Sequence, residues 1–177
     1  HLIMGDIAGV RDDRVTIDVK AMGSAPIERL DIFCGRELIE TIRPFSKHDL
    51  GRHIRIAMEG AEYRGRARTT IWDGSLNLNG NVITDAVMLN NWNRDRGIGA
   101  RSDSSLAWKA VTTGNTCGID LWLADAAQGE IAITTKHTSP TVRVGDIGLN
   151  DLVFDAGGLE RRLRLYRLPD SPHEPRV

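Results

Sequence analysis

Short segments in which apolar and polar residues alternate run through most of the chain, and they constrain its fold more than any other feature. Residues 15–21, 54–58 and 119–123 are examples in which every second side chain is apolar. A period of two is typical of a strand with one buried face, whereas an amphipathic helix repeats after roughly 3.6 residues. The pattern therefore predicts an all-β protein.

Turn residues separate these segments at intervals of about ten residues, a spacing typical of an antiparallel β-sandwich of about eleven strands, immunoglobulin-like or jelly-roll-like. Gly35 predicts a hairpin over residues 27–42, and Asn79-Gly80-Asn81 predicts another, because Asn and Gly tolerate a positive φ. The core is expected to contain the apolar members of the strands, namely Val15, Ile17, Val19, Leu30, Ile32, Ile54, Ile56, Leu121, Leu123, Ile131, Ile133, Leu163 and Leu165.

The chain has 177 residues, enough for one domain with a sizeable core. We expect a single β-sandwich domain over residues 1–168. Three prolines in residues 169–177 predict a flexible C-terminal tail. Because the chain opens with His1, we expect a fragment of a longer protein with an upstream domain.

The charge balance and the hydropathy pattern exclude two classes of partner. The chain has 23 Lys and Arg against 24 Asp and Glu, whereas a dedicated nucleic-acid binder usually carries a basic excess. It has no apolar run of the roughly 18 residues that a membrane-spanning helix needs. Neither a nucleic acid nor a membrane is therefore expected as a partner.

Arg64, Arg66 and Arg68 alternate with small residues, which predicts a strand over residues 64–72 with three guanidinium groups on one face. Such a face binds anions or nucleic acid, or it is a solvated sheet face whose Arg stems cover apolar surface. The near-zero net charge favours the solvated face, and we interpret Arg162 and Arg164 in the same way.

No motif predicts catalysis. The chain lacks the G-x-S-x-G motif, and His48 and His53 would point to opposite faces of a strand because their separation is odd. We therefore expect no catalytic residue, no metal site and no cofactor, and thus no enzyme activity, in this chain. Cys34 and Cys117 are expected to be reduced and buried, although their spacing leaves a disulfide open.

The polar segment over residues 90–104 is the candidate binding region, because it is longer than a connection between two strands requires. A Trp ring stacks on the apolar face of a sugar, and amides, carboxylates and guanidinium groups bind its hydroxyls. The alternative is that Trp92 anchors the segment on the core. The candidate residues for binding a partner or a ligand are Trp92, Asn93, Arg94, Asp95, Arg96 and Arg101.

Five stretches occur in an order that resembles a known family. They are Met4-Gly5-Asp6, Ser24-Ala25-Pro26-Ile27-Glu28-Arg29-Leu30, Thr70-Ile71-Trp72-Asp73-Gly74-Ser75-Leu76, Ser105-Leu106-Ala107-Trp108-Lys109 and Asp155-Ala156-Gly157-Gly158-Leu159. Nearly the whole chain resembles the C-terminal β domain of an uncharacterised bacterial family. In that family the β domain follows a catalytic domain similar to PHP-type (polymerase and histidinol phosphatase) metal-dependent phosphoesterases.

This resemblance implies a non-catalytic accessory domain that packs on an upstream, PHP-like hydrolase domain. The metal ligands of the family belong to its catalytic domain, and no stretch of this chain matches them, so no site residue is carried over. Two alternatives stay open: a carbohydrate- or ligand-binding module that uses the Trp92 segment, and an independent β-sandwich enzyme.

Overall fold

The computed structural model describes residues 7, 9, 16–25 and 27–170. The stretch Met4-Gly5-Asp6 and residues 171–177 of the expected tail lie outside this range. The chain forms two compact units, His1–Pro44 and Phe45–Val177, whereas sequence analysis expected one domain over residues 1–168.

The first unit contains the hairpin that the sequence predicts. Strands β1 (Leu30–Cys34) and β2 (Glu37–Ile42) pair antiparallel across a turn in which Gly35 has a φ of 62°. The strand expected over residues 15–21 is wrong, because residues 16–21 are not a strand, and Ile17 and Val19 are 75% and 55% exposed. An alternating segment becomes a strand only when a neighbour supplies hydrogen bonds, and no described strand pairs with this one. Val15 lies outside the described residues.

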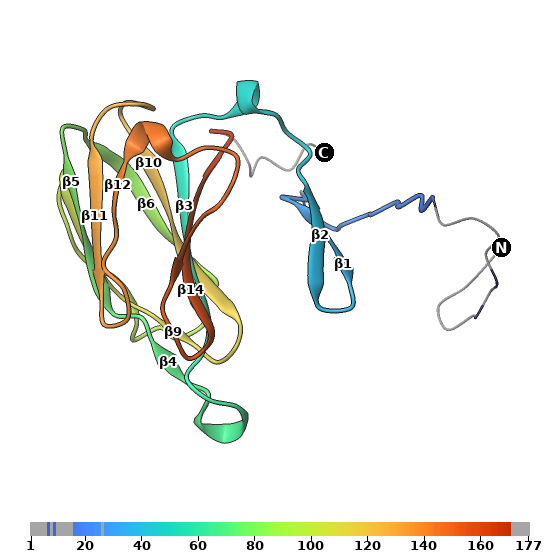
Figure 1. Ribbon diagram of the computed structural model, residues 1–177. Coiled ribbons are helices and arrows are strands. Elements are labelled where there is room, and N and C mark those ends of the chain that lie inside the picture. Colours follow the sequence, from blue (N-terminus) through green and yellow to red (C-terminus); the bar gives the residue numbers. More distant parts are fainter. Residues whose placement is uncertain (1–6, 8, 10–15, 26, 171–177) are drawn as a thin grey trace. The chain divides into compact units, whose positions relative to one another are not determined.

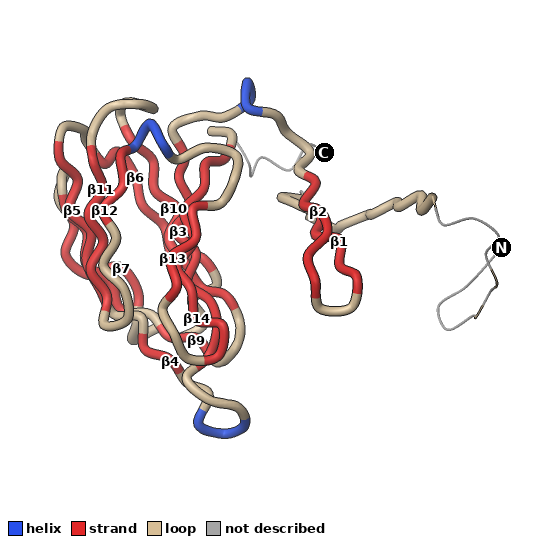
Figure 2. Tube along the Cα trace, viewed as in Figure 1, coloured by secondary structure: helices blue, strands red, loops and turns tan. Residues whose placement is uncertain are grey.

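The second unit is a sandwich of two five-stranded sheets in which every pair is antiparallel (Figures 1 and 2). One sheet has the order β13 (Leu152–Asp155), β14 (Leu159–Leu168), β3 (His53–Ala61), β10 (Thr116–Leu123) and β6 (Ile83–Leu89). The other has the order β12 (Thr141–Arg143), β11 (Glu130–Thr135), β5 (Gly74–Asn79), β8 (Ser105–Lys109) and β7 (Gly97–Arg101). A short ladder joins β4 (Thr70–Ile71) to β9 (Val111–Thr112). The predicted all-β, antiparallel class is confirmed, with 14 described strands instead of about eleven.

Helical structure in the described residues is confined to three 3₁₀ turns, η1 (Lys47–Asp49), η2 (Gly65–Ala67) and η3 (Val144–Asp146). No helix in this part of the chain has the length and apolar character that crossing a membrane demands. The strand expected from Arg64 is wrong, because η2 occupies this stretch and only Thr70–Ile71 is a strand. Gly65 has a φ of 80°, which turns the backbone, so the three arginines do not share a strand face.

The turn Asn79-Gly80-Asn81 does not close the expected hairpin. Gly80 has the positive φ that the sequence predicts, at 74°, but β5 and β6 belong to different sheets. The side-chain amide of Asn81 donates to the carbonyl oxygens of Asp125 and Gln128, at 2.8 and 2.7 Å. These bonds hold the turn against a neighbouring loop, and the chain crosses there from one sheet to the other.

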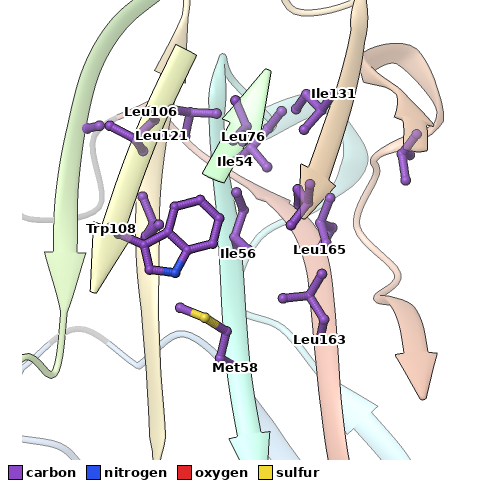
Figure 3. Packing of buried hydrophobic residues seen from close by; sticks show 14 of the residues in the cluster. Ile54, Ile56, Met58, Leu76, Leu106, Trp108, Leu121, Ile131, Leu163 and Leu165 are labelled. Atoms are coloured by element: carbon purple, nitrogen blue, oxygen red, sulfur yellow. The ribbon is translucent and has the colours of Figure 1, made fainter. Parts of the chain in front are cut away.

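The core fills the space between the two sheets of the sandwich (Figure 3). Ile56 and Leu121 of one sheet and Leu76 and Ile131 of the other are each fully buried. Burying one such side chain stabilises a fold by about 1.5–3 kcal/mol. The expected core residues that are confirmed are Ile54, Ile56, Leu121, Leu123, Ile131, Ile133, Leu163 and Leu165, whereas Leu30 and Ile32 are only half-buried.

Two tryptophans lie in this core with their polar atoms satisfied. The indole nitrogen of Trp72 donates to the hydroxyl of Thr112 at 3.0 Å, and that of Trp108 donates to the carbonyl of Trp72 at 2.7 Å. A buried indole N–H without an acceptor would cost stability. These bonds therefore fix the position of β8, whose outward-facing side chains contribute to the candidate site described below.

Candidate functional site

The predicted binding segment lies at the edge of the second sheet. Part of it is a strand rather than a loop, because β7 occupies residues 97–101 and pairs with β8. Trp92 is 65% exposed, so its ring is not an anchor on the core. The irregular part is therefore a short connection before β7, with its aromatic ring in solvent.

Asparagine side chains hold this connection in shape. The amide of Asn91 donates to the carbonyl of Arg96 at 2.6 Å, and the side-chain oxygen of Asn93 accepts from the backbone N–H of Asp95 at 3.0 Å. The N–H of Arg96 in turn donates to the carbonyl of Asn93 at 3.1 Å. The turn over residues 93–96 is thus ordered by its own hydrogen bonds before any ligand arrives.

A hollow of 460 Å³ opens beside this turn, over β7 and β8. Its volume is within the range of small-molecule sites, roughly 300–1,000 Å³. The hollow is lined by Arg94, Asp95, Arg96, Gly97, Ile98, Gly99, Ala100, Ala107, Trp108 and Lys109.

Small residues make the floor of the hollow. A Cβ atom at Gly99 would lie 3.7 Å from the carbonyl oxygen of Ala107, an ordinary contact, so neither packing nor backbone conformation requires glycine there. Ile98, one residue away, packs against the core with its side chain. Gly99 and Ala107 therefore leave room at the floor that larger side chains would fill, whereas a Cβ atom at Gly97 would lie 3.3 Å from Nδ2 of Asn91.

The cations around the hollow differ in how they are paired. Arg96 donates from Nη1 to Oδ1 of Asp73 at 2.6 Å and to the carbonyl of Ala110 at 3.3 Å, which fixes its guanidinium group. The side chains of Arg94 and Lys109 have no ion-pair or hydrogen-bond partner within the described part of the chain. The lining thus carries three positive charges and one carboxylate, Asp95.

The structure brings together only half of the candidate residues. Arg94, Asp95 and Arg96 line the hollow, whereas Trp92 and Asn93 do not. Arg101 lies elsewhere, with its Nη1 3.0 Å from Oδ1 of Asp85.

Sequence analysis missed one cation of the site. Lys109 was not among the candidates, although in β8 it alternates with Trp108, which faces the core, and therefore points outward. Gly97 lies opposite Lys109 in the register of β7 and β8. A prediction that residues 97 and 109 pair would therefore have placed Lys109 at the site.

His48 and His53 do not come together as metal ligands. His48 lies in η1, and His53 is fully buried on β3, where its ring stacks on Trp122 with centroids 4.2 Å apart. Within the described ranges, no group of three His, Cys, Asp or Glu side chains converges as a metal ion requires.

A second charged cluster lies on β3 and β10, but it is buried. The guanidinium group of Arg55 donates to both carboxylate oxygens of Asp120, at 2.6 and 2.7 Å. Nε2 of His53 lies 3.3 Å from Oδ1 of Asp120 without the alignment of a hydrogen bond. Burial alone raises the pKa of Asp120, but the bonds from Arg55 and the proximity of His53 outweigh it and lower that pKa to about 2.

The same face carries a further ion-paired group that contradicts the interpretation of a solvated face for Arg164 but not for Arg162, whose side chain is 46% exposed. Arg164 is 7% exposed and contacts Glu59 on β3 and Asp151, while Arg162 donates to Glu59 at 2.7 Å. Because Arg55 pairs with Asp120 and Arg164 pairs with Glu59 in buried positions, the cluster serves the packing of β3, β10 and β14. The open hollow at β7 and β8, by contrast, is a site that a ligand can enter.

Comparison of the chain with protein-family models, with curated proteins and with solved structures finds no match.

Proposed function

We propose that the chain is a non-catalytic accessory β-sandwich domain that packs on a PHP-like, metal-dependent hydrolase domain of the same polypeptide. The observation that carries this proposal is the exposed apolar surface of the hairpin β1–β2. We define this apolar hairpin surface as Phe33, Leu38, Ile39 and Ile42, which are 58%, 51%, 59% and 44% exposed.

The hairpin exposes apolar side chains beside polar ones. On one face Asp31 lies opposite Thr41, whose hydroxyl donates to Oδ1 of Asp31 at 2.8 Å. The Leu30–Ile42 pair occupies the other face, and Phe33 pairs with Leu38 beyond a bulge. Phe33 lies two residues after Asp31, and Leu38 is adjacent to Ile39, so apolar side chains are exposed on both faces of the hairpin, where a partner can cover them.

The energetics of a two-stranded ladder support a partner. An isolated hairpin is marginally stable in water, because it buries too little apolar surface to offset the entropy of ordering its residues. In β2 every residue is exposed. Covering the apolar hairpin surface with another domain removes four large side chains from water, at about 25 cal/mol per Å².

The charges of the hairpin favour a protein surface over a lipid surface. Glu37, Glu40 and Asp31 accompany the basic Arg36, so the hairpin lacks the basic cluster that anionic membranes attract. The resemblance to a family in which such a β domain follows a hydrolase domain supports the identity of the partner. The accessory domain would then support the catalytic domain or shape its cleft.

Activity assays of two preparations test the proposal. The 177-residue chain, assayed with Mn²⁺ or Zn²⁺ and a generic phosphoester such as p-nitrophenyl phosphate, is expected to show no turnover. The natural full-length polypeptide is expected to hydrolyse phosphoesters with metal dependence. Metal-dependent turnover by the 177-residue chain that is lost on His53→Ala or His48→Ala would contradict the proposal.

A further inference from the structure

We propose that the hollow over β7 and β8 binds an anionic saccharide, that is, a sugar residue carrying a carboxylate or a sulfate group. The inference is independent of the proposed function, since it concerns the sandwich and not the hairpin. It follows from the cations, the carboxylate and the floor of one hollow of 460 Å³.

The unpaired cations call for an anion. Arg94 and Lys109 lack side-chain partners among the described residues, and both line the hollow together with Arg96. A guanidinium fork binds a carboxylate or sulfate through two parallel hydrogen bonds, and an ammonium group adds a compact charge. The Asp73 carboxylate offsets the charge of Arg96 but holds its guanidinium group in place, so the remaining N–H donors of Arg96 are preordered for a ligand.

The carboxylate of Asp95 indicates what else the ligand carries. Asp95 lines the same hollow, and its side chain has no partner in the described chain. A bare inorganic anion would be repelled by this carboxylate. A ligand with hydroxyl donors beside its acid group satisfies Asp95 and the cations together, and that combination is the chemistry of an acidic sugar.

The floor fits a flat, compact ring. Gly97, Gly99 and Ala107 project almost nothing into the hollow, so a pyranose can approach the sheet backbone closely. The turn beside it is preordered by Asn91 and Asn93, which reduces the entropy lost on binding. The volume admits about one or two sugar residues.

Isothermal titration of the 177-residue chain tests the proposal, with trigalacturonate as the carboxylated probe and its methyl ester as the matched neutral probe. A sulfated galactose oligomer tests whether the site accepts a sugar with a sulfate group instead of a carboxylate. Inorganic phosphate tests whether an anion without a sugar binds. We expect one or both anionic saccharides to bind, and the methyl ester to bind at least about tenfold more weakly than trigalacturonate where the latter binds. Binding of phosphate alone, equal binding of the ester, or no binding at all would overturn the proposal.

Variants of the chain locate the site. Lys109→Gln and Arg94→Gln are each expected to weaken saccharide binding about tenfold, since each removes a charge-assisted hydrogen bond. Arg101→Gln is the matched control, because Arg101 ends β7, which lines the hollow, but pairs with Asp85 outside the hollow.

Gly99→Val adds a steric test. The φ of Gly99 is not in the left-handed region, and a Cβ atom there makes only an ordinary contact with the carbonyl oxygen of Ala107, so valine is tolerated by the fold but occupies the floor. We expect it to weaken binding with an unchanged melting temperature. Binding that survives Lys109→Gln, Arg94→Gln and Gly99→Val would refute the assignment.

Discussion

Arg55 on β3 lies directly opposite Asp120 on β10, and its guanidinium group holds both carboxylate oxygens of that residue in the interior of the protein. The two side chains are 7% and 8% exposed. A buried pair of this kind makes the register of the two strands specific, because a slip by one residue would leave both charges unpaired.

Replacing one residue of the Arg55–Asp120 pair is expected to destabilise the protein far more than replacing both. Asp120→Asn leaves the Arg55 charge uncompensated and should lower the free energy of unfolding by about 3–5 kcal/mol. The double variant Arg55→Met/Asp120→Leu should be much closer to the parent chain, since apolar residues of similar size replace the pair. Urea denaturation followed by Trp fluorescence measures both; a double variant less stable than Asp120→Asn would show that the pair itself drives stability.

The lowered pKa of Asp120 predicts an acid-dependent loss of stability. Its pKa falls from 3.8 to about 2 on folding, so the stabilisation is complete above pH 4 and is lost as the pH falls through 2. The full effect is about 2 kcal/mol. The unfolding free energies at pH 6 and pH 2.5 should therefore differ less in Arg55→Met/Asp120→Leu than in the parent chain; an identical pH dependence in the two would contradict this account.

Truncating a side chain of the core should destabilise the protein more than truncating an exposed one. Ile56→Ala or Leu121→Ala should lower the free energy of unfolding by about 2–5 kcal/mol, because both side chains are fully buried between the sheets. Val82→Ala should change it by less than about 0.5 kcal/mol, since that side chain is largely exposed before β6. A loss below about 0.5 kcal/mol for Ile56→Ala would mean that the strand register is wrong.

The two free thiols should differ in reactivity. Cys34 is exposed at the end of β1, whereas burial of Cys117 raises its pKa to about 12 and so removes its thiolate at neutral pH. Ellman's reagent at pH 8 should modify one thiol in the native chain and two in urea, and Cys34→Ser should abolish the native reaction. Two reactive thiols in the native chain would refute the burial of Cys117. Sequence analysis expected both to be buried, because it did not anticipate how exposed the hairpin is.

The predictions that succeeded depended on short-range pattern. Alternation of apolar residues located β3, β10, β11 and β14, because the core between two sheets selects every second side chain whatever the topology. The turn at Gly80 shows the limit of such reasoning. The positive φ of Gly80 was predictable from the sequence, but the hairpin does not form. The sheet that the chain joins after this turn depends on the long-range bonds of Asn81 to Asp125 and Gln128.

Short-range pattern was equally insufficient to predict the full set of residues at the site. Composition drew attention to Arg94, Asp95 and Arg96, which lie next to one another in the sequence. Lys109 joins them only through the pairing of β7 with β8, and the burial of Arg164 depends on its pairing with Glu59, 105 residues away. Pairings between distant segments are what the sequence pattern leaves open, and they determined which charges are free to bind and which are buried.

Hydrogen exchange of the hairpin amides tests the central claim, the docking of the hairpin on a hydrolase domain, most directly. The measurement compares residues 30–42 in the 177-residue chain and in the natural full-length polypeptide, with β10 as an internal reference. The substitutions Leu38→Asp and Ile42→Asp together disrupt the apolar hairpin surface. Val82→Asp is the control at similar exposure, and all four tryptophans lie after residue 45, so their fluorescence reports whether the sandwich is folded.

The account predicts fast exchange over residues 30–42 in the 177-residue chain and strong protection in the full-length polypeptide. That protection should be lost in Leu38→Asp/Ile42→Asp and kept in Val82→Asp, with β10 equally protected throughout. Equally fast exchange of the hairpin amides in the 177-residue chain and in the full-length polypeptide would contradict the claim.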